Sequence, residues 1–158
     1  MILSAEATMS VSTSTQRRWF TSYVQALMAA IMEEPVEPDG DGDFPVPGET
    51  AWAWVRPAAR EPWGVQVFAL AAQDVPMRAA VLREINEVNG SDPAIRVAFH
   101  SSGSVMVDYR LFADAVTEDN LRGVLGRVLT VADRIGPMLT AVHGGTTPIA
   151  ATSSPSEL

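Results

Sequence analysis

The chain has 158 residues, 47% hydrophobic and 19% charged, and this balance predicts one globular domain and excludes wholesale disorder. It contains no cysteine, which excludes disulfides, thiolate catalysis and cysteine-ligated zinc and fits a reducing compartment. The net charge of -8 argues against nucleic acid as a partner, because that affinity depends on clustered Lys and Arg.

The sequence shows no signal for a membrane or for secretion. No run approaches the ~18 apolar residues that a membrane span needs. The first ten residues lack the basic start and apolar core of a signal peptide. We therefore expect a cytoplasmic protein with no membrane partner.

The first 12 residues are small and polar, and we expect them to be flexible. A helix is predicted over residues 13–34, where Thr13 and Gln16 form a capping box. Its apolar residues recur at helical spacing: Phe20, Tyr23, Val24, Leu27 and Ile31. Pro35 and Pro38 end it.

An acidic segment, Asp-Gly-Asp-Gly-Asp over residues 39–43, resembles the start of a calcium loop. Such a loop needs Gly at its sixth position and Glu at its twelfth, where this chain has Phe44 and Thr50. A solvated turn is the better interpretation, so no metal ligands and no cofactor are predicted, and cation binding here stays open.

Three strands follow the acidic turn. Residues 44–47 form a short edge strand, because Pro45 and Pro47 cannot donate to a neighbour. Residues 50–56 and 64–72 alternate with period two, and both faces of each strand are apolar enough to be buried. If helices cover only one side of the sheet, one of the two apolar faces of these strands must meet water or another molecule.

Asp74 to Pro76 opens a second helix that ends at Asn89 and Gly90. Residues 95–112 then form a hairpin with a three-residue turn, Ser101 to Gly103. This register sets Phe99 against Val105, Val97 against Val107 and Ile95 against Tyr109, and it pairs Arg96 with Asp108 across the outer face.

Thr117 caps a long third helix whose apolar stripe extends to Val142. From residue 144 the composition turns to Gly, Thr, Ser, Pro and Ala, which predicts a disordered tail over residues 144–158. The prediction is one α+β domain over residues 13–143, in which helices cover an antiparallel sheet in the order α-β-β-β-α-β-β-α.

No residue pattern indicates catalysis, so the protein is not expected to be an enzyme. His100 and His143 are far apart in the sequence and are interpreted as solvated imidazoles. The serines at positions 101, 102 and 104 lie in a hairpin turn rather than in a nucleophile elbow, and no Gly-rich loop is placed to hold a nucleotide.

Four tryptophans and several methionines exceed what a core of this size requires. They are either core residues or part of a partner surface, where Trp is enriched. The candidate partner-binding residues are Trp19, Met28, Trp52, Trp54 and Phe68.

Several motifs together resemble the YbjN-like family, which has the type III secretion chaperone-like fold. They are the helix end Ile85-Asn86-Glu87-Val88-Asn89, the hairpin after it, Ala132-Asp133, and Gly144-Gly145 after the last helix. The resemblance covers residues 76–145. It implies a non-catalytic, often dimeric, peptide-binding or chaperone-like protein.

The leading hypothesis is a binding module whose exposed apolar sheet or helix surface engages a peptide, a protein or a second copy of itself. The alternative is a regulatory domain that senses a small apolar ligand between sheet and helices.

Overall fold

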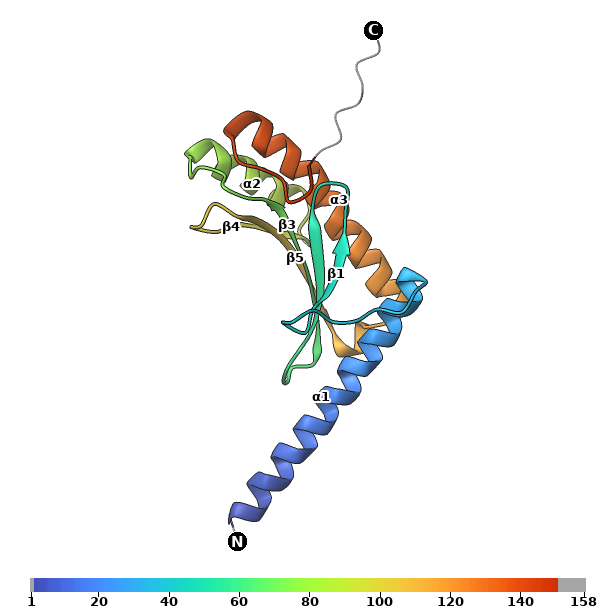
Figure 1. Cartoon of the computed structure of the whole chain (residues 1–158). Coiled ribbons are helices and arrows are strands. Elements are labelled where there is room, and N and C mark those ends of the chain that lie inside the picture. The colour runs from blue at the N-terminus through green and yellow to red at the C-terminus, as the bar shows by residue number, and fades with distance from the viewer. Residues whose placement is uncertain (1, 151–158) are drawn as a thin grey trace.

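The computed structural model describes the backbone of residues 2–150 and the side chains of residues 13–150 (Figure 1). The elements follow in the order α1 (Ile2–Met32), β1 (Phe44–Pro47), β2 (Trp52–Pro57), β3 (Gly64–Ala72), α2 (Ala79–Ser91), β4 (Arg96–Phe99), β5 (Val105–Phe112), the 3₁₀ turn η1 (Ala113–Ala115) and α3 (Glu118–His143). The predicted α+β class and order of elements are confirmed.

The five strands form one antiparallel sheet in the order β1-β2-β3-β5-β4, so β1 and β4 are its edges. In Figure 1, α3 lies along one side of the sheet, with α1 and α2 packed near its two ends. α3 contacts β2, β3 and β5, α2 contacts β4, and α1 contacts α3 and β2. The helices therefore form one layer against one face of the sheet.

The core lies between the sheet and this helical layer. Alternate residues of each strand point into it. Most of those of β2, β3 and β5 are small and fully buried: Ala53, Val55, Val65, Val67, Ala69, Val105 and Val107. Tyr109 and Leu111 of β5 are the larger members of the same row. α3 approaches the sheet closely at Gly136, where an added Cβ would collide with the backbone carbonyl of Ala71. A helix can pack this closely only where the residue has no side chain.

The hairpin has the predicted register. Phe99 pairs with Val105, Val97 with Val107 and Arg96 with Asp108. The turn is closed by a 2.9 Å bond from the His100 N–H to the Ser104 carbonyl, and Gly103 has a φ of +90°. The three-residue turn was derived from matching apolar rows, and it is confirmed.

Two predicted helix starts are wrong. α1 begins at Ile2, so Thr13 lies inside the helix and is not its N-cap. The flexibility of residues 1–12 stays a prediction. α2 begins at Ala79, because Asp74 takes a left-handed φ of 54° and the Val75 N–H donates to the Gly103 carbonyl at the hairpin tip.

The ends of α3 are determined by its flanking residues. The Thr117 hydroxyl accepts a hydrogen bond from the Asn120 N–H at 3.2 Å, which confirms the predicted cap. Gly144 and Gly145, both near φ +95°, then turn the chain back toward the sheet.

A disordered tail is wrong for residues 144–150. Thr146 and Gln73 exchange two backbone hydrogen bonds of 2.8 and 2.9 Å, and the Ile149 N–H donates to the Thr50 carbonyl. An added Cβ at Gly145 would collide with the Gln73 carbonyl, so this return needs glycine. The other residues of the predicted tail, 151–158, lie outside the described residues.

Candidate partner-binding surface

The other face of the sheet, here called the open face, is not covered by any helix of the described chain. Its residues fall into rows because neighbouring strands are in register. One row runs Pro47, Trp52, Leu70 and Met106, and the next runs Pro45, Trp54, Phe68 and Asp108. We call Trp52, Trp54, Phe68, Leu70 and Met106 the apolar patch.

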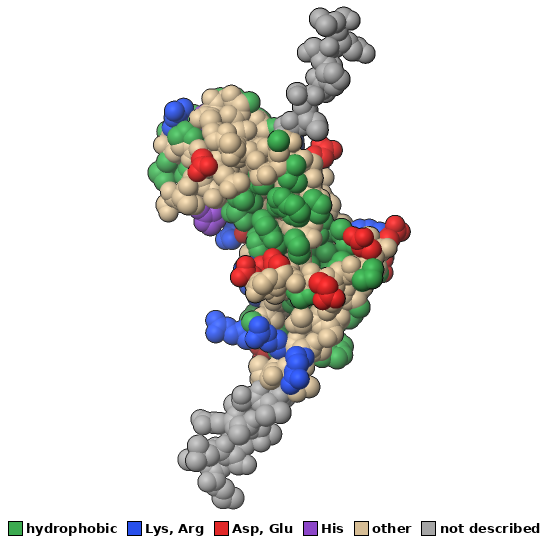
Figure 2. Space-filling model, in the orientation of Figure 1, with side chains coloured by type: hydrophobic (Ala, Val, Ile, Leu, Met, Phe, Trp, Pro, Cys, Tyr) green, Lys and Arg blue, Asp and Glu red, His purple; other side chains and the backbone are tan. Residues whose placement is uncertain are grey.

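All five residues of the apolar patch are only partly buried. Figure 2 shows hydrophobic side chains gathered over the strands at the middle of the molecule. A contiguous apolar surface of this kind is characteristic of a site that another molecule covers.

The aromatic pair at the centre of the patch is held in place on one side. The Trp54 and Phe68 rings stack with centroids 5.5 Å apart, and the Arg56 guanidinium lies 4.7 Å from the centre of the Phe68 ring. Arg56 in turn makes two hydrogen bonds, of 2.8 and 2.6 Å, to the buried carboxylate of Asp43. This hydrogen bond raises the pKa of Arg56, and the cation is thereby fixed beside the aromatic rings.

An acidic turn borders the patch at the β1 edge. The Asp39 carboxylate accepts hydrogen bonds from the N–H groups of Asp41 and Asp43 at 2.9 and 3.0 Å, which shows that this segment is a turn closed by its own side chain. The turn forms one wall of a shallow depression of about 500 Å³ whose floor includes Trp54, Phe68 and Leu70. Within residues 13–150, no group of three acidic or histidine side chains is placed to hold a metal ion.

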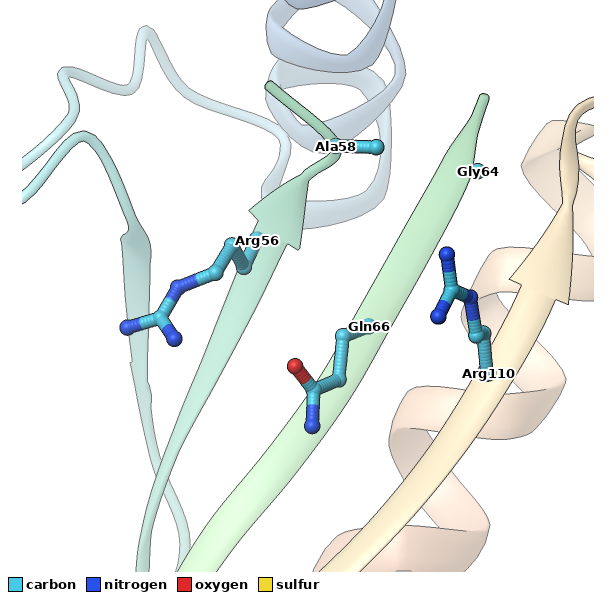
Figure 3. A pocket seen from close by; sticks show the side chains of 5 residues that line it. All are labelled: Arg56, Ala58, Gly64, Gln66 and Arg110. Atoms are coloured by element: carbon cyan, nitrogen blue, oxygen red, sulfur yellow. The ribbon is translucent and has the colours of Figure 1, made fainter. Parts of the chain in front are cut away.

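A polar row follows the apolar rows along the strands. Arg56, Gln66 and Arg110 lie opposite one another on β2, β3 and β5 and line a pocket of about 90 Å³ with Ala58 and Gly64 (Figure 3). Arg56 is neutralised by Asp43, whereas Arg110 has no carboxylate partner among the described residues. The open face is therefore apolar in the middle, acidic at one side and weakly cationic at one end.

Asp133 of α3 anchors the loop that leads into β2. Its carboxylate accepts hydrogen bonds from the backbone N–H groups of Glu49, Thr50 and Ala51 at 2.8 to 3.0 Å and from the Thr50 hydroxyl at 3.3 Å. Burial disfavours the charged carboxylate, but the three backbone donors together outweigh it and lower the pKa of Asp133. The strand that carries Trp52 and Trp54 is thereby tied to the helical layer.

The structure brings together three of the five predicted site residues, Trp52, Trp54 and Phe68. Met28 is 1% exposed and packs in the core, so its placement on an exposed surface is wrong: it lies on the same side of α1 as Phe20 and Val24. Trp19 is 67% exposed but stacks on Tyr23 of α1, with ring centroids 5.6 Å apart, and it lines a different pocket.

Sequence reasoning missed two members of the patch, Leu70 and Met106. The signal was available, because Leu70 shares its strand parity with Phe68 and Met106 is two residues from Asp108. Extending the hairpin register to β3 would have placed both beside the tryptophans.

The histidines differ from one another. His143 is not a solvated imidazole: its side chain is 7% exposed and its Nε2 lies 2.9 Å from the Glu84 carboxylate. His100 is exposed at the hairpin turn, as expected. His143 lies on α3 and contacts α2, whereas His100 lies in the turn between β4 and β5.

A small pocket lies where α1 meets the start of β3. It has about 230 Å³ and is lined by Gln16, Trp19, Phe20, Trp63 and Ala113. Pockets for drug-sized ligands are typically about 300 to 1,000 Å³, so this one is at most suited to a small apolar group.

Across residues 2–150, no helix combines the length and apolar character that crossing a membrane requires.

Two solved structures resemble this one in fold. The first is a crystal structure of the ExsC-ExsE complex, with a TM-score of 0.62 and 20% identity over 75% of this chain and 95% of that chain. The second is the Yersinia pestis type III secretion chaperone SycH in complex with a stable fragment of YscM2, with a TM-score of 0.56 and 19% identity over 71% of this chain and 96% of that chain. Both likenesses agree with the α+β fold described above.

The family model for "T3SS (YopN, CesT) and YbjN peptide-binding chaperone 1" matches residues 18–151, which is most of the chain. No curated protein matches it in sequence. The resemblance drawn from the helix end at Asn89, the hairpin and the Gly-Gly pair is confirmed. The chain therefore belongs to the family of T3SS and YbjN peptide-binding chaperones.

Proposed function

We propose that this protein is a non-catalytic, chaperone-like module that binds a peptide or protein partner on its apolar patch. The observation that carries the proposal is a sheet with helices on one face only and five partly exposed apolar side chains gathered on the other. Membership of a peptide-binding family supports the same class of partner. The absence of cysteine supports the cytoplasm as the compartment.

A matched pair of leucines tests this function. Leu70 lies in the apolar patch, whereas Leu82 is exposed on α2, on the helical side of the domain. The probe is a reduced, carboxymethylated unfolded protein, and binding is measured by fluorescence anisotropy. We expect Leu70→Ser to weaken binding about fivefold or more and Leu82→Ser to leave it unchanged. Equal affinities for the two variants would contradict the proposal.

We also propose that a second copy of the chain binds at the groove between α2 and α3. The groove is lined by Glu84, Glu87, Val88, Ser91, Met138 and Val142. Met138 is 44% and Val142 67% exposed, and they lie one turn apart on α3, so a second copy that covered the groove would bury both. Sedimentation equilibrium should show a dimer that Val142→Glu converts to monomer; a monomeric wild-type chain would rule this interface out.

The alternative function, small-ligand sensing, is favoured only by the 230 Å³ pocket at α1. A ligand that fits it should raise the melting temperature by mass action. A thermal-shift screen of small apolar metabolites, with Trp63→Ala as the control, tests this alternative independently of the apolar patch.

A further inference from the structure

The β1 edge of the sheet cannot accept another strand. Pro45 pairs with Trp54 and Pro47 with Trp52. Since proline cannot donate a hydrogen bond, these are the pairs whose backbone nitrogens point away from β2. An added strand would find carbonyls at both positions but no N–H groups.

The β4 edge is partly closed, in a different way. The Asn89 side chain of α2 accepts from the Val97 N–H at 2.8 Å and donates to the Val97 carbonyl at 2.9 Å. The Ile95 N–H is bonded to the Asp92 carbonyl at 3.3 Å. Of the two β4 residues whose backbone groups point outward, Val97 and Phe99, the first is therefore already paired within the chain.

Since the β1 edge lacks donors and the β4 edge has its Val97 groups occupied, neither edge offers a full ladder of hydrogen bonds, and we expect a bound segment to be held through its side chains on the open face. The distance from Pro47 across β2 and β3 to Met106 is three strand spacings, or about 14 Å. On an α-helix, residues i to i+7 span about 10 Å and residues i to i+11 about 16 Å. Three helical turns of apolar side chains thus match the length of the row from Pro47 to Met106.

The charges around the patch favour positively charged groups of a bound segment at the end where the acidic turn lies. Asp43 is neutralised by Arg56, and Asp108 by Arg96. Asp39 and Asp41 form no ion pair among the described residues, although both lie close enough to Arg56 to interact with its charge, and both line the depression beside Trp54. Basic side chains at that end of a bound segment would complement them.

We propose that the apolar patch takes an amphipathic α-helix of a partner protein, with an apolar stripe of about three turns and Lys or Arg over residues 39–43. This inference rests on the proposed function and adds the conformation and charge of the partner.

The test uses the full chain and three synthetic peptides of roughly 18 residues, or five helical turns. The first arranges Leu and Lys with helical period, the second has the same composition in strict alternation, and the third replaces Lys with Glu. We expect the first to bind about tenfold more tightly than either of the others and to gain helical circular dichroism on binding. In spectra of the four indole N–H groups, the Trp52 and Trp54 signals should shift and those of Trp19 and Trp63 should not.

A charge reversal in the acidic turn, with the same reversal elsewhere as its control, tests where the basic side chains of the peptide bind. Asp41→Lys should weaken the helical Leu–Lys peptide about fivefold, whereas Asp119→Lys, the same change on exposed α3 surface, should leave it unchanged. Equal binding of the alternating peptide, or equal effects of the two reversals, would overturn the inference. Patch-dependent binding of the unfolded protein would then still support the proposed function. Indole shifts caused by self-association alone would assign the patch to a second copy and overturn the inference.

Discussion

The two faces of the sheet use the same strands for different purposes. On β3, the residues toward the helices are Val65, Val67 and Ala69, whereas Phe68 and Leu70 face outward. On β3 the covered face carries only small side chains, and α3 packs close to the backbone of this strand at Gly136. The open face instead carries large rings and ion pairs. Stability should therefore depend on one face and binding on the other, and strand periodicity allows them to be altered separately.

The largest contrast should come from the same substitution in the two environments. Leu121 of α3 is fully buried in the core, and Leu70 is partly exposed on the open face. Leu121→Ala should lower the free energy of unfolding by about 3 kcal/mol, and Leu70→Ala by about 1 kcal/mol. Urea denaturation measures both. Similar losses would show that the open face also contributes to the core.

The next effect concerns the link between the two layers. Asp133→Ala leaves three backbone N–H groups without their acceptor and should lower the free energy of unfolding by roughly 2 to 3 kcal/mol. Asp133→Asn keeps one acceptor oxygen and should be milder. If the Ala variant unfolds at the same urea concentration as the wild type, this carboxylate does not hold the layers together.

A smaller effect is expected at the β4 edge. Asn89→Ala should cost about 1 to 2 kcal/mol and free the backbone of Val97, so light scattering should detect association of native chains. Asn86 is exposed on the same helix and provides the control. A variant that stays monodisperse would show that Asn89 is not what keeps this edge closed.

The smallest expected effect is on the pH dependence of stability. The folded pKa of Asp133 is lowered relative to the unfolded value of about 3.9. Its contribution is therefore fully present above that value and is lost as the pH falls through the folded pKa. Acid titration of urea midpoints should show a steeper loss for the wild type than for Asp133→Asn. Parallel curves would contradict this assignment.

Local pattern was sufficient for much of the fold. The hairpin register followed from matching Phe99 to Val105, and the edge position of β1 followed from its two prolines. Residues that act at long range were beyond such reasoning. Asp133 is bonded to a loop more than eighty positions away, and residues 144–150 have no periodicity, yet they pair with Gln73 and Thr50.

The candidate site was also predictable from the sequence only in part. Strand parity placed Trp52 and Trp54 on one face of their strand, and the structure adds Phe68 beside them. Helical spacing alone could not decide which side of α1 is buried, so Met28 was misplaced. The role of Asn89 was also hidden: the family motif contains it, but only the structure shows that it pairs with the backbone of Val97.

The bonds from Asp133 to the β1–β2 loop have a thermodynamic consequence for recognition. They prevent α3 from sliding along the sheet without breaking three hydrogen bonds at once. The apolar patch is consequently held in place before a partner arrives, so in the proposed complex we expect the conformational entropy to be lost mainly by the incoming segment. Affinity should then increase when that segment is already helical before it arrives.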